Sequence, residues 1–540
     1  MDRRGKHMTK ALIIGSGAAA AGAALALSRR EDLEIVVIDI GLELEVDRAR
    51  LIDALAAASP HEWDAPTIEL ISQQPVAGRD SRVPEKRVFG SDYPFRNVGQ
   101  LGGLTTVNGA TASLISPAYG GFSNVWGSQV MPFTPAAFAG WPVNAAAMRP
   151  HYEAILRQIP FAGEEDDLAA SFPLMRPPSP LPSMSHRSRR VLTDYEKHKA
   201  RLKDRGITMG KARLALDATG CVRCGMCMTG CPYRLIYSAA QTFDALRRAG
   251  RVIFNSGFMA LKLIAEADRA AVITKEIATG RIRRFEADRI FVACGAMGTT
   301  RLVANSLELF DIDLPMLESR QFVLPLLSLR ATEDPRQQRD FTLNQFNMIV
   351  APDHAAADLA TIHFYTFNSA FISGLPRVLR IRSAEWLQVQ LLRRLTVAFG
   401  YLPSWNSPRL RVHIGARCSQ PELPGFHISG EAPPPGQRRM LREVMLRLIQ
   451  SAGVLDLYPV LPMLRLSAPG KSYHWGGSFP SVTGRDRATM FSSDRLGRVG
   501  SWDRIHLVDA AVFPSVPAMT YGLTVMANAH RIATESLELT

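Results

Sequence analysis

The N-terminal part of the chain alternates between short apolar runs and glycine-rich turns in the order strand, turn, helix, strand. Residues 11–14 form an apolar run of the kind that makes a buried parallel strand, and two glycines interrupt it. The alanine-rich run that follows predicts a helix, and residues 33–39 (LEIVVID) predict a second buried strand that ends in a carboxylate. This order predicts the first βαβ unit of a Rossmann-like α/β domain.

The turn between the first strand and the helix carries a G-x-G-x-x-A nucleotide fingerprint. Gly15 allows the tight turn, Gly17 lets the backbone approach a pyrophosphate, and Ala20 lets helix and strand pack closely. Asp39 stands about 20 residues further on, where a ribose-binding acid belongs. The basic and then apolar N-terminus also mimics a secretory signal peptide, but a signal peptide gives no reason for an apolar strand that ends in Asp39. The fingerprint predicts a nucleotide cofactor without separating NAD from FAD.

The length and net charge of the chain limit the possible domain organisation and binding partners. A chain of 540 residues exceeds what one hydrophobic core usually holds, so two or more structural units are expected. The net charge of +13 is explained most simply by a solvated basic surface. An acidic electron-transfer partner, an anionic substrate or peripheral contact with a membrane surface are the alternatives. The sequence has no zinc-finger, basic-zipper or RNA-binding signature and no run of eighteen apolar residues. We therefore expect no nucleic-acid partner, no transmembrane segment and a cytoplasmic location.

Four of the six cysteines lie within one stretch of eleven residues. Cys221, Cys224, Cys227 and Cys231 follow the spacing C-x2-C-x2-C-x3-C-P, which matches the run found in bacterial-type ferredoxins. A disulfide pair does not suit a cytoplasmic chain that is otherwise poor in cysteine, and structural zinc usually draws two well-separated pairs. The spacing therefore predicts that these four residues bind an iron–sulfur cluster.

The number of ligands in this cluster stays open. In two-cluster ferredoxins the fourth cysteine of such a run serves the other cluster, and only one run exists here. Either Cys231 joins the same cluster, or three cysteines hold a three-iron cluster, or the remote Cys294 or Cys418 completes a cubane. We place the four-iron (4Fe-4S) cluster ahead of the three-iron (3Fe-4S) cluster. Cys294 itself is interpreted first as a buried small residue.

Four further segments resemble the glucose–methanol–choline (GMC) family of FAD-dependent oxidoreductases. They are residues 120–133 (GGFSNVWGSQVMPF), 287–306, 472–480 (SYHWGGSFP) and 505–533. The resemblance covers roughly a third of the chain and implies that the nucleotide is FAD. It also implies cofactor contacts at Gly121, Ser123, Asn124 and Trp126 in the first segment, and at Asp509 and Ala510 in the last.

The same resemblance implies that His474 is the catalytic general base. A neutral imidazole can accept an alcohol proton near neutral pH while the carbinol C–H leaves as a hydride. The family usually has a second His or an Asn shortly after its C-terminal F-P, and here Thr520 or Tyr521 stands in that place. Either hydroxyl could hydrogen-bond a substrate oxygen. Asn528 is a further candidate for the missing partner, and His530 is interpreted as structural.

The expected fold is α/β: a Rossmann-like FAD-binding domain with an inserted α+β substrate-binding (cap) domain and a Cys-rich iron–sulfur loop. Residues near 165–205, rich in Pro, Ser and Arg, suggest an exposed linking segment, and residues 376–411 suggest a helix with its apolar face on the core. The expected divisions are FAD-binding (8–135), linking or cap segment (136–214), iron–sulfur loop and FAD-binding (215–310), substrate-binding (311–468) and C-terminal FAD-binding (469–540).

These observations together predict an oxidoreductase acting on CH–OH donors. A flavin takes two electrons as a hydride, and an iron–sulfur cluster passes electrons singly. A cluster beside a flavin therefore predicts a dehydrogenase for a sugar or other alcohol, with an electron-acceptor protein or a quinone as partner. A GMC-type oxidase with a structural cluster, and a non-catalytic electron-relay flavoprotein, are the alternatives.

Overall fold

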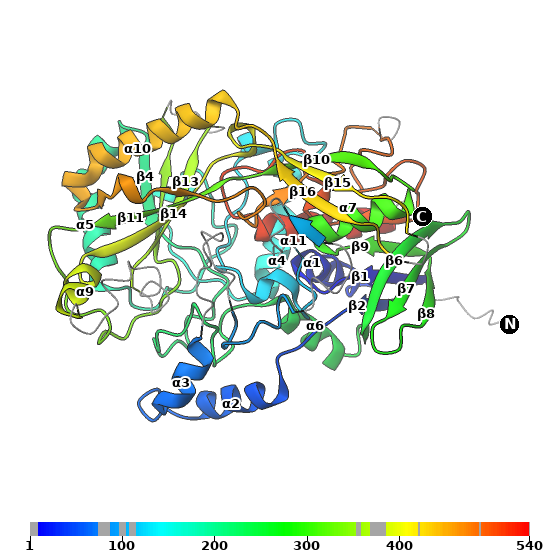
Figure 1. Cartoon of the computed structure of the whole chain (residues 1–540), viewed down its shortest axis with the longest axis horizontal. Coiled ribbons are helices and arrows are strands. Elements are labelled where there is room, and N and C mark those ends of the chain that lie inside the picture. Colours follow the sequence, from blue (N-terminus) through cyan, green and yellow to red (C-terminus); the bar gives the residue numbers. More distant parts are fainter. Residues whose placement is uncertain are drawn as a thin grey trace.

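The computed structural model describes residues 9–73, 87–96, 104–106, 115–352, 358–367, 385–418, 422–484 and 488–538. Within these ranges the chain forms one elongated α/β body, with its two main sheets toward opposite ends of the long axis (Figure 1). The expected start of the first domain at residue 8 falls outside the described residues.

The two ends of the chain share one parallel sheet. Its strand order is β20-β9-β1-β2-β5, and all four neighbouring pairs are parallel. The predicted strands at 11–14 and 33–39 lie within β1 and β2 and pair directly with each other. The bounds are β1 (Thr9–Ile14), β2 (Leu33–Asp39), β5 (Ile253–Ser256), β9 (Arg289–Val292) and β20 (Ile505–Leu507).

Helices cover this sheet, and one contact between them is unusually close. Helix α1 has the sequence AAAAGAALAL and is buried at eight of its ten positions. A Cβ atom on Gly22 would overlap the backbone carbonyl of Met526 in α11, so the two helix backbones touch. The helices of this part are α1 (Ala18–Leu27), α4 (Ala145–Gln158), α6 (Ala239–Arg248), α7 (Gly295–Ser306) and α11 (Gly522–Glu538).

The second main sheet has seven strands and a separate core. Its order is β17-β11-β14-β13-β12-β4, with β18 also paired to β11. One face packs an apolar core that includes Phe322, Met348 and Ile362 against helices α5 (His186–Lys203) and α10 (Pro435–Leu455). The strands are β4 (Ile207–Lys211), β11 (Gln321–Leu327), β12 (Phe346–Val350), β13 (Ala360–Tyr365), β14 (Leu395–Tyr401), β17 (Tyr458–Pro459) and β18 (Arg465–Leu466).

Two smaller sheets and six short 3-10 helices complete the described elements. The sheet β19-β10-β15-β16-β3 consists of β3 (Leu104–Thr106), β10 (Ile312–Glu318), β15 (Leu410–Ile414), β16 (Phe426–Gly430) and β19 (Trp475–Gly476). The three-stranded sheet consists of β6 (Phe258–Ala265), β7 (Ala270–Glu276) and β8 (Ile282–Ala287). The 3-10 helices are η2 (Gly121–Asn124), η3 (Pro135–Phe138), η4 (Asp167–Ala170), η7 (Ser404–Asn406), η8 (Leu461–Met463) and η10 (Ala510–Val512). Residues 311–468 therefore contribute strands to two sheets, and the expected domain divisions stay a prediction.

The region near 165–205 differs from the exposed linking segment expected from its composition. Residues 186–203 form α5, and the side chains of Val191, Tyr195 and Leu202 are buried in the core under the seven-stranded sheet. The prediction failed because Arg and Lys dominate the composition of the helix, whereas the few apolar residues are spaced along the face that packs on the sheet.

The region 376–411 also differs from the expected single helix. Residues 376–384 lie outside the described residues, α9 (Glu385–Leu392) is short, and β14 and β15 take up most of the remainder. Trp386 and Leu387 are exposed by 69% and 51%, so the expected apolar face on the core is wrong for these two residues.

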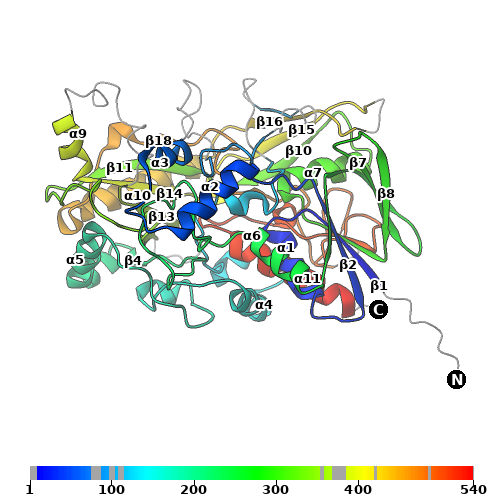
Figure 2. The same ribbon diagram turned by 90° about the horizontal axis from the view of Figure 1, so that it is seen from below.

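Two helices lie apart from the sheets. Figure 2 shows α2 (Val46–Ala57) and α3 (Ala65–Ser72) lying over the middle of the body when it is seen from below. Their inner residues Ile52, Leu55 and Ile71 pack with Met226 of the cysteine stretch. Over the described ranges, no helix combines the length and the apolar character needed to cross a membrane.

The close contact of α1 with α11 predicts that Gly22→Ala destabilises the protein. The added methyl group meets a backbone carbonyl that cannot rotate away, so we expect the free energy of unfolding to fall by about 1–3 kcal/mol in urea titrations. The control is Gly453→Ala in α10, where a Cβ would lie 3.9 Å from the Tyr458 hydroxyl, an ordinary contact. This substitution should stabilise the protein by roughly 0.5–1 kcal/mol. Equal effects of the two would contradict the proposed backbone contact.

Candidate active site and cysteine pocket

The turn between β1 and α1 leaves room for a ligand at the start of the helix. Gly15 has a φ of +106°, and a Cβ there would overlap the carbonyl oxygen of Ala293, so the position requires glycine. Gly17 begins α1 without a capping side chain, and a Cβ there would meet no atom within 4 Å. Ala20 is fully buried. The open, uncapped N-terminus of α1 has the form that binds a phosphate group.

Asp39 lies beside this turn and is held by Ser16. The Ser16 hydroxyl donates to the Asp39 carboxylate and accepts from the Gly120 N–H at 2.9 Å. The Ile40 N–H donates to the other carboxylate oxygen at 2.8 Å. Burial raises the pKa of Asp39 to about 7, against the lowering effect of these hydrogen bonds. The acid predicted at the end of β2 is therefore next to the glycine turn.

The segment 120–127 crosses the same turn. A Cβ on Gly121 would come within 3.2 Å of the Gly17 Cα, so two glycines allow this close approach. The Ser123 hydroxyl accepts from the Ala239 N–H at 2.8 Å, and the Asn124 amide donates to the Tyr119 carbonyl at 2.9 Å. These bonds fix η2 between α1 and α6.

The C-terminal pair Asp509 and Ala510 lies at the end of β20. The Asp509 carboxylate accepts from the Thr299 hydroxyl and from the Ala511 N–H, the latter at 2.9 Å. Burial raises the pKa of Asp509 to about 6. The Ala510 carbonyl accepts from the Gly477 N–H at 2.8 Å. Asp509 therefore lies close to the segment that carries His474.

Cys294 joins the two acidic positions. Its thiol is buried in the turn after β9, and its pKa is raised by burial and by the charges of Asp509 and Asp39. The Sγ atom donates to the Ile14 carbonyl at 3.7 Å. The structure thus brings the acids from the two chain ends to the same edge of the parallel sheet, where its strands end.

His474 is a partly buried imidazole without a partner for one ring nitrogen. Its Nδ1 atom is buried and makes no hydrogen bond, although a buried polar atom normally has one. Burial, and to a smaller extent the nearby His363, lowers the pKa of His474 to about 3. The ring stacks on Tyr401 with centroids 4.6 Å apart, and it contacts the Tyr521 ring at 5.1 Å. An imidazole in this state can accept a proton from a bound ligand.

Thr520 and Tyr521 lie beside His474, but their hydroxyl groups donate to the backbone. The Tyr521 hydroxyl is 3.1 Å from the Trp475 carbonyl and 3.2 Å from the Tyr473 carbonyl. The Thr520 hydroxyl donates to the Gln129 carbonyl at 3.3 Å. Asn528 accepts from the Arg531 guanidinium, and His530 lies 2.9 Å from the Nδ1 atom of His151.

Two polar residues of the seven-stranded sheet belong to the same neighbourhood and were missed in the sequence. The His363 ring contacts Tyr401 at 5.3 Å, and its Nε2 atom is buried without a partner. Asn347 pairs with His363 across β12 and β13, and both atoms of its amide are likewise buried and unpartnered. The only signal was the alternation in ATIHFY (residues 360–365), which would ordinarily indicate a face toward water.

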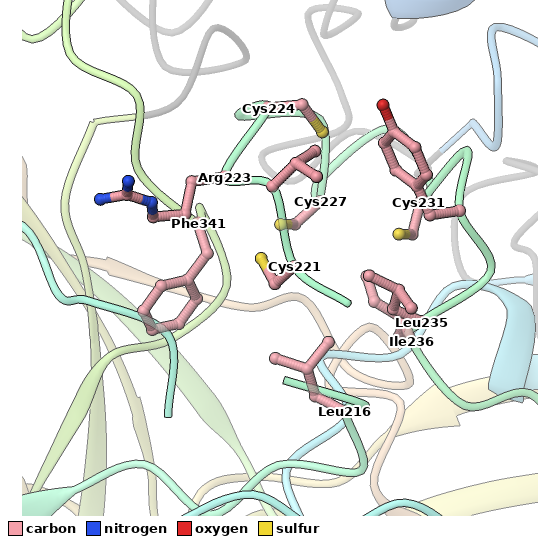
Figure 3. A pocket seen from close by; sticks show the side chains of 11 residues that line it. Leu216, Cys221, Arg223, Cys224, Cys227, Cys231, Leu235, Ile236 and Phe341 are labelled. Atoms are coloured by element: carbon pink, nitrogen blue, oxygen red, sulfur yellow. The ribbon is translucent and has the colours of Figure 1, made fainter. Parts of the chain in front are cut away.

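The four clustered cysteines line one pocket. Figure 3 shows their side chains around a cavity whose other walls include Leu216, Leu235 and Phe341. The cavity measures about 360 Å³ when its opening to solvent is included. Cys294 and Cys418 are not among the residues that line it, and all six cysteines are free thiols.

Their surroundings favour the neutral thiol form of Cys221, Cys224 and Cys231. Burial raises the pKa of Cys224 to about 12 and that of Cys231 to about 11, and the neighbouring cysteines contribute to both shifts. Backbone N–H groups oppose this: Tyr233, Leu235 and Ile236 donate toward Cys231. The Thr342 N–H donates to the Cys227 sulfur at 3.4 Å.

The pocket does not form a site for a single metal ion. Among the residues that the structure describes, no group of three or more His, Cys, Asp or Glu side chains could hold one. A zinc ion needs every thiolate sulfur about 2.3 Å from one centre. The four cysteines therefore line one pocket, and the described residues show no site for a single ion there.

The cysteine stretch is attached directly to the segment 120–127. Leu216 and Ile236 form an isolated antiparallel β-bridge, and the four cysteines lie between these two residues in the sequence. The Trp126 indole N–H donates to the Tyr237 carbonyl at 2.8 Å. Tyr237 stands six positions after Cys231, which limits the distance between their Cα atoms to about 22 Å.

Solved structures with a similar overall fold include two proteins named as oxidases. Pyridoxine 4-oxidase from Mesorbium loti superposes with a TM-score of 0.59 and 14% identity, covering 98% of this chain and 99% of that chain. Two variants of formate oxidase from Aspergillus oryzae RIB40, described in connection with FAD modification, give TM-scores of 0.59 and 0.60 at 14% and 13% identity, with 98% of each chain covered. No family model matches the sequence, and no curated protein matches it either. At these identities the likeness shows a shared mixed α/β fold.

The raised pKa of Asp39 predicts that Asp39→Asn removes a pH dependence of stability. The folded chain keeps the proton to about pH 7, whereas the unfolded carboxyl releases it near pH 3.9. The contribution to stability is therefore full below pH 4 and is lost as the pH rises toward 7, by at most about 1.4 kcal/mol per pH unit. Urea titrations of the nucleotide-free protein from pH 5 to 8 should show this slope in the wild type and a flatter one in the variant. The matched control is Asp47→Asn, because the side chain of Asp47 is exposed. Identical slopes in wild type and Asp39→Asn would contradict the prediction.

Proposed function

We propose that the protein is an FAD-dependent oxidoreductase of the glucose–methanol–choline type that oxidises a CH–OH group. The observation that carries the proposal is His474: a partly buried imidazole with a lowered pKa and an unpartnered Nδ1 atom, whose chain neighbours Tyr473 and Trp475 contact Phe122 of the segment 120–127. The fold shared with pyridoxine 4-oxidase and formate oxidase supports it.

The residues around the turn fit FAD. Gly15, Gly17 and Ala20 would hold the pyrophosphate at the start of α1, and Asp39 would bind the ribose. Gly121, Ser123, Asn124 and Trp126 would lie along the flavin, with Asp509 and Ala510 at the far end of the same edge. When bound, FAD supplies a two-electron acceptor that takes a hydride from carbon.

His474 would accept the hydroxyl proton of the substrate. The C–H bond breaks with its electron pair, the O–H proton goes to the imidazole, and the C–OH becomes C=O. Burial between Tyr401 and Tyr521 keeps the imidazole neutral and fixes its ring plane. Because the Tyr521 hydroxyl already donates to two backbone carbonyls, we assign Tyr521 a positioning role. Thr520, bonded to the Gln129 carbonyl, has the same role.

The four cysteines of the pocket would hold a four-iron cluster. Their thiols line one cavity, and backbone N–H groups already donate toward the sulfurs of Cys227 and Cys231. Such N–H donors are among the features that tune an iron–sulfur cluster. Cys221, Cys224, Cys227 and Cys231 would each supply one thiolate. The cluster would supply one-electron transfer away from the flavin domain.

This arrangement favours a dehydrogenase over an oxidase. The stretch with the four cysteines is followed by Tyr237, whose carbonyl accepts a hydrogen bond from Trp126 of the segment 120–127. The two redox sites would therefore share one rigid element. A second cavity of about 1000 Å³, its opening included, reaches Cys224 and Met226 from the other side and gives an external acceptor access. The alternative, direct reduction of oxygen with a structural cluster, is supported by the names of the similar structures. Rapid reoxidation of the reduced flavin by air would favour that alternative.

The role of His474 predicts a large loss of activity in His474→Asn. Removal of a general base should slow anaerobic flavin reduction by about 10²–10⁴-fold, measured by stopped-flow absorbance with the best donor from an alcohol and sugar screen. Because the pKa of His474 is lowered to about 3, the wild-type rate should stay level as the pH falls from 8 to 5. A histidine with an ordinary pKa near 6.5 would lose its activity in that range.

His506→Asn is the matched control for this experiment. His506 is also buried with a lowered pKa, but it stacks on Phe291 and bonds the Leu496 carbonyl within the parallel sheet. Its replacement should leave the rate of flavin reduction within about twofold. A His474→Asn protein that reduces flavin at the wild-type rate would remove the proposed base.

The cysteine pocket predicts bound iron. Protein purified without oxygen should contain about four irons per chain, and Cys224→Ser should lower the iron content while leaving the flavin content unchanged. Cys418→Ser is the control, because Cys418 bonds the Leu423 carbonyl outside the pocket. Yellow flavin bands with no iron, no EPR signal after reduction and rapid reaction with oxygen would identify the oxidase instead.

A further inference from the structure

The seven-stranded sheet has an unusual inner face. On β13, Ile362 and Phe364 point into the apolar core shared with α5 and α10. The alternate residues Thr361 and His363 face the other way, and yet their exposures are only 1% and 2%. A polar sheet face is normally wet, so this one is buried against the rest of the body.

Two side chains on this face have polar atoms without partners. Asn347 and His363 are directly opposite each other on antiparallel strands, which brings their side chains together on the same face. Both amide atoms of Asn347 and the Nε2 atom of His363 are buried and unpartnered. An unmet buried hydrogen-bonding group costs about 1–3 kcal/mol, so three of them in one place indicate a site for a ligand.

Tyr401 lies between this pair and the candidate catalytic base, His474. The Tyr401 ring contacts His363 at 5.3 Å and His474 at 4.6 Å. The Tyr401 hydroxyl accepts from the Gln321 amide at 3.0 Å, which fixes the ring between the two imidazoles. A ligand whose reacting hydroxyl meets His474 can therefore extend across Tyr401 to Asn347 and His363.

We propose that Asn347 and His363 bind a second oxygen of the substrate, so that the enzyme selects polyhydroxylated compounds over simple alcohols. The inference rests on the proposed function. An amide offers a donor and an acceptor, and a neutral imidazole nitrogen offers one or the other, which matches uncharged hydroxyl groups. Burial lowers the pKa of His363 to about 4, in keeping with an uncharged partner. A simple alcohol would leave these groups unpaired, and sites of this kind reject analogues that lack the bonded group.

The test compares donors of equal carbon number: propanol with glycerol, hexanol with sorbitol, and cyclohexanol with inositol. Anaerobic flavin reduction by the wild-type holoenzyme should have a kcat/KM at least about 100-fold higher for the polyhydroxylated member of at least one pair. Asn347→Leu and His363→Leu should each raise the KM for that donor by about 10-fold or more and raise kcat/KM for its simple alcohol, because no buried polar group is then left unpaired. The thermal midpoint of Asn347→Leu should be equal to or above that of the wild type, because a costly buried amide is gone.

Thr396→Val is the matched control. The Thr396 hydroxyl is also buried and unpartnered on the same sheet, but on the face of Ala398, toward the apolar core of α5 and α10. Removal of this hydroxyl should change neither the KM nor the kcat/KM of the polyhydroxylated donor or of its simple alcohol. Equal reduction of flavin by both members of every pair, or an equal loss for both donors with a lowered thermal midpoint, overturns the substrate-binding role while the proposed function stands. No flavin reduction by any donor overturns both.

Discussion

The close approach of α1 and α11 is the constraint on which the rest of the molecule depends. Gly22 brings the helix of the first βαβ unit against the backbone of Met526, near the end of the chain. This contact and the pairing of β20 with β9 place the C-terminal segment on the nucleotide turn. Asp39 and Asp509 are 470 positions apart in the sequence. They nevertheless share one edge of the parallel sheet, with Cys294 between them. A larger residue at position 22 would push apart the two halves of the candidate active site.

Burial then sets the chemistry of the side chains at this edge. The same loss of water raises the pKa values of Asp39 and Asp509 and lowers that of His474. In each case the uncharged form is favoured, because a charge in a dry site has little to stabilise it. The lowered pKa keeps the His474 imidazole unprotonated, which is the form that can take a hydroxyl proton, and it also makes the imidazole a weaker base. The same physics applies to the cysteine pocket, where thiols stay protonated unless a cationic group displaces their protons.

The two proposed redox sites are linked by backbone pairing that local sequence does not reveal. The cysteine stretch begins and ends at Leu216 and Ile236, and the neighbouring Tyr237 carbonyl accepts from Trp126. One glycine-rich segment therefore supports both the nucleotide turn and the cysteines. Under the proposed function, electrons would leave through the cysteine pocket, and an external acceptor would approach through the wider cavity beside Cys224.

The sequence by itself determined those local elements whose residues fit only one backbone conformation. Gly15, Gly17 and the strand that ends in Asp39 specify their turn because only glycine fits a φ of +106° at the first position and only an apolar run can be buried on both faces. The cysteine spacing specified a shared pocket because residues two or three apart cannot be far from one another.

Only the tertiary structure decided which side chains become buried without partners. The sequence did not reveal Thr361, His363 and Asn347, and it predicted an exposed linking segment where α5 lies, because alternation and composition record polarity but not what packs against it. The polar face beside His474 exists because one sheet is laid against another part of the chain, and no short window of sequence contains that contact.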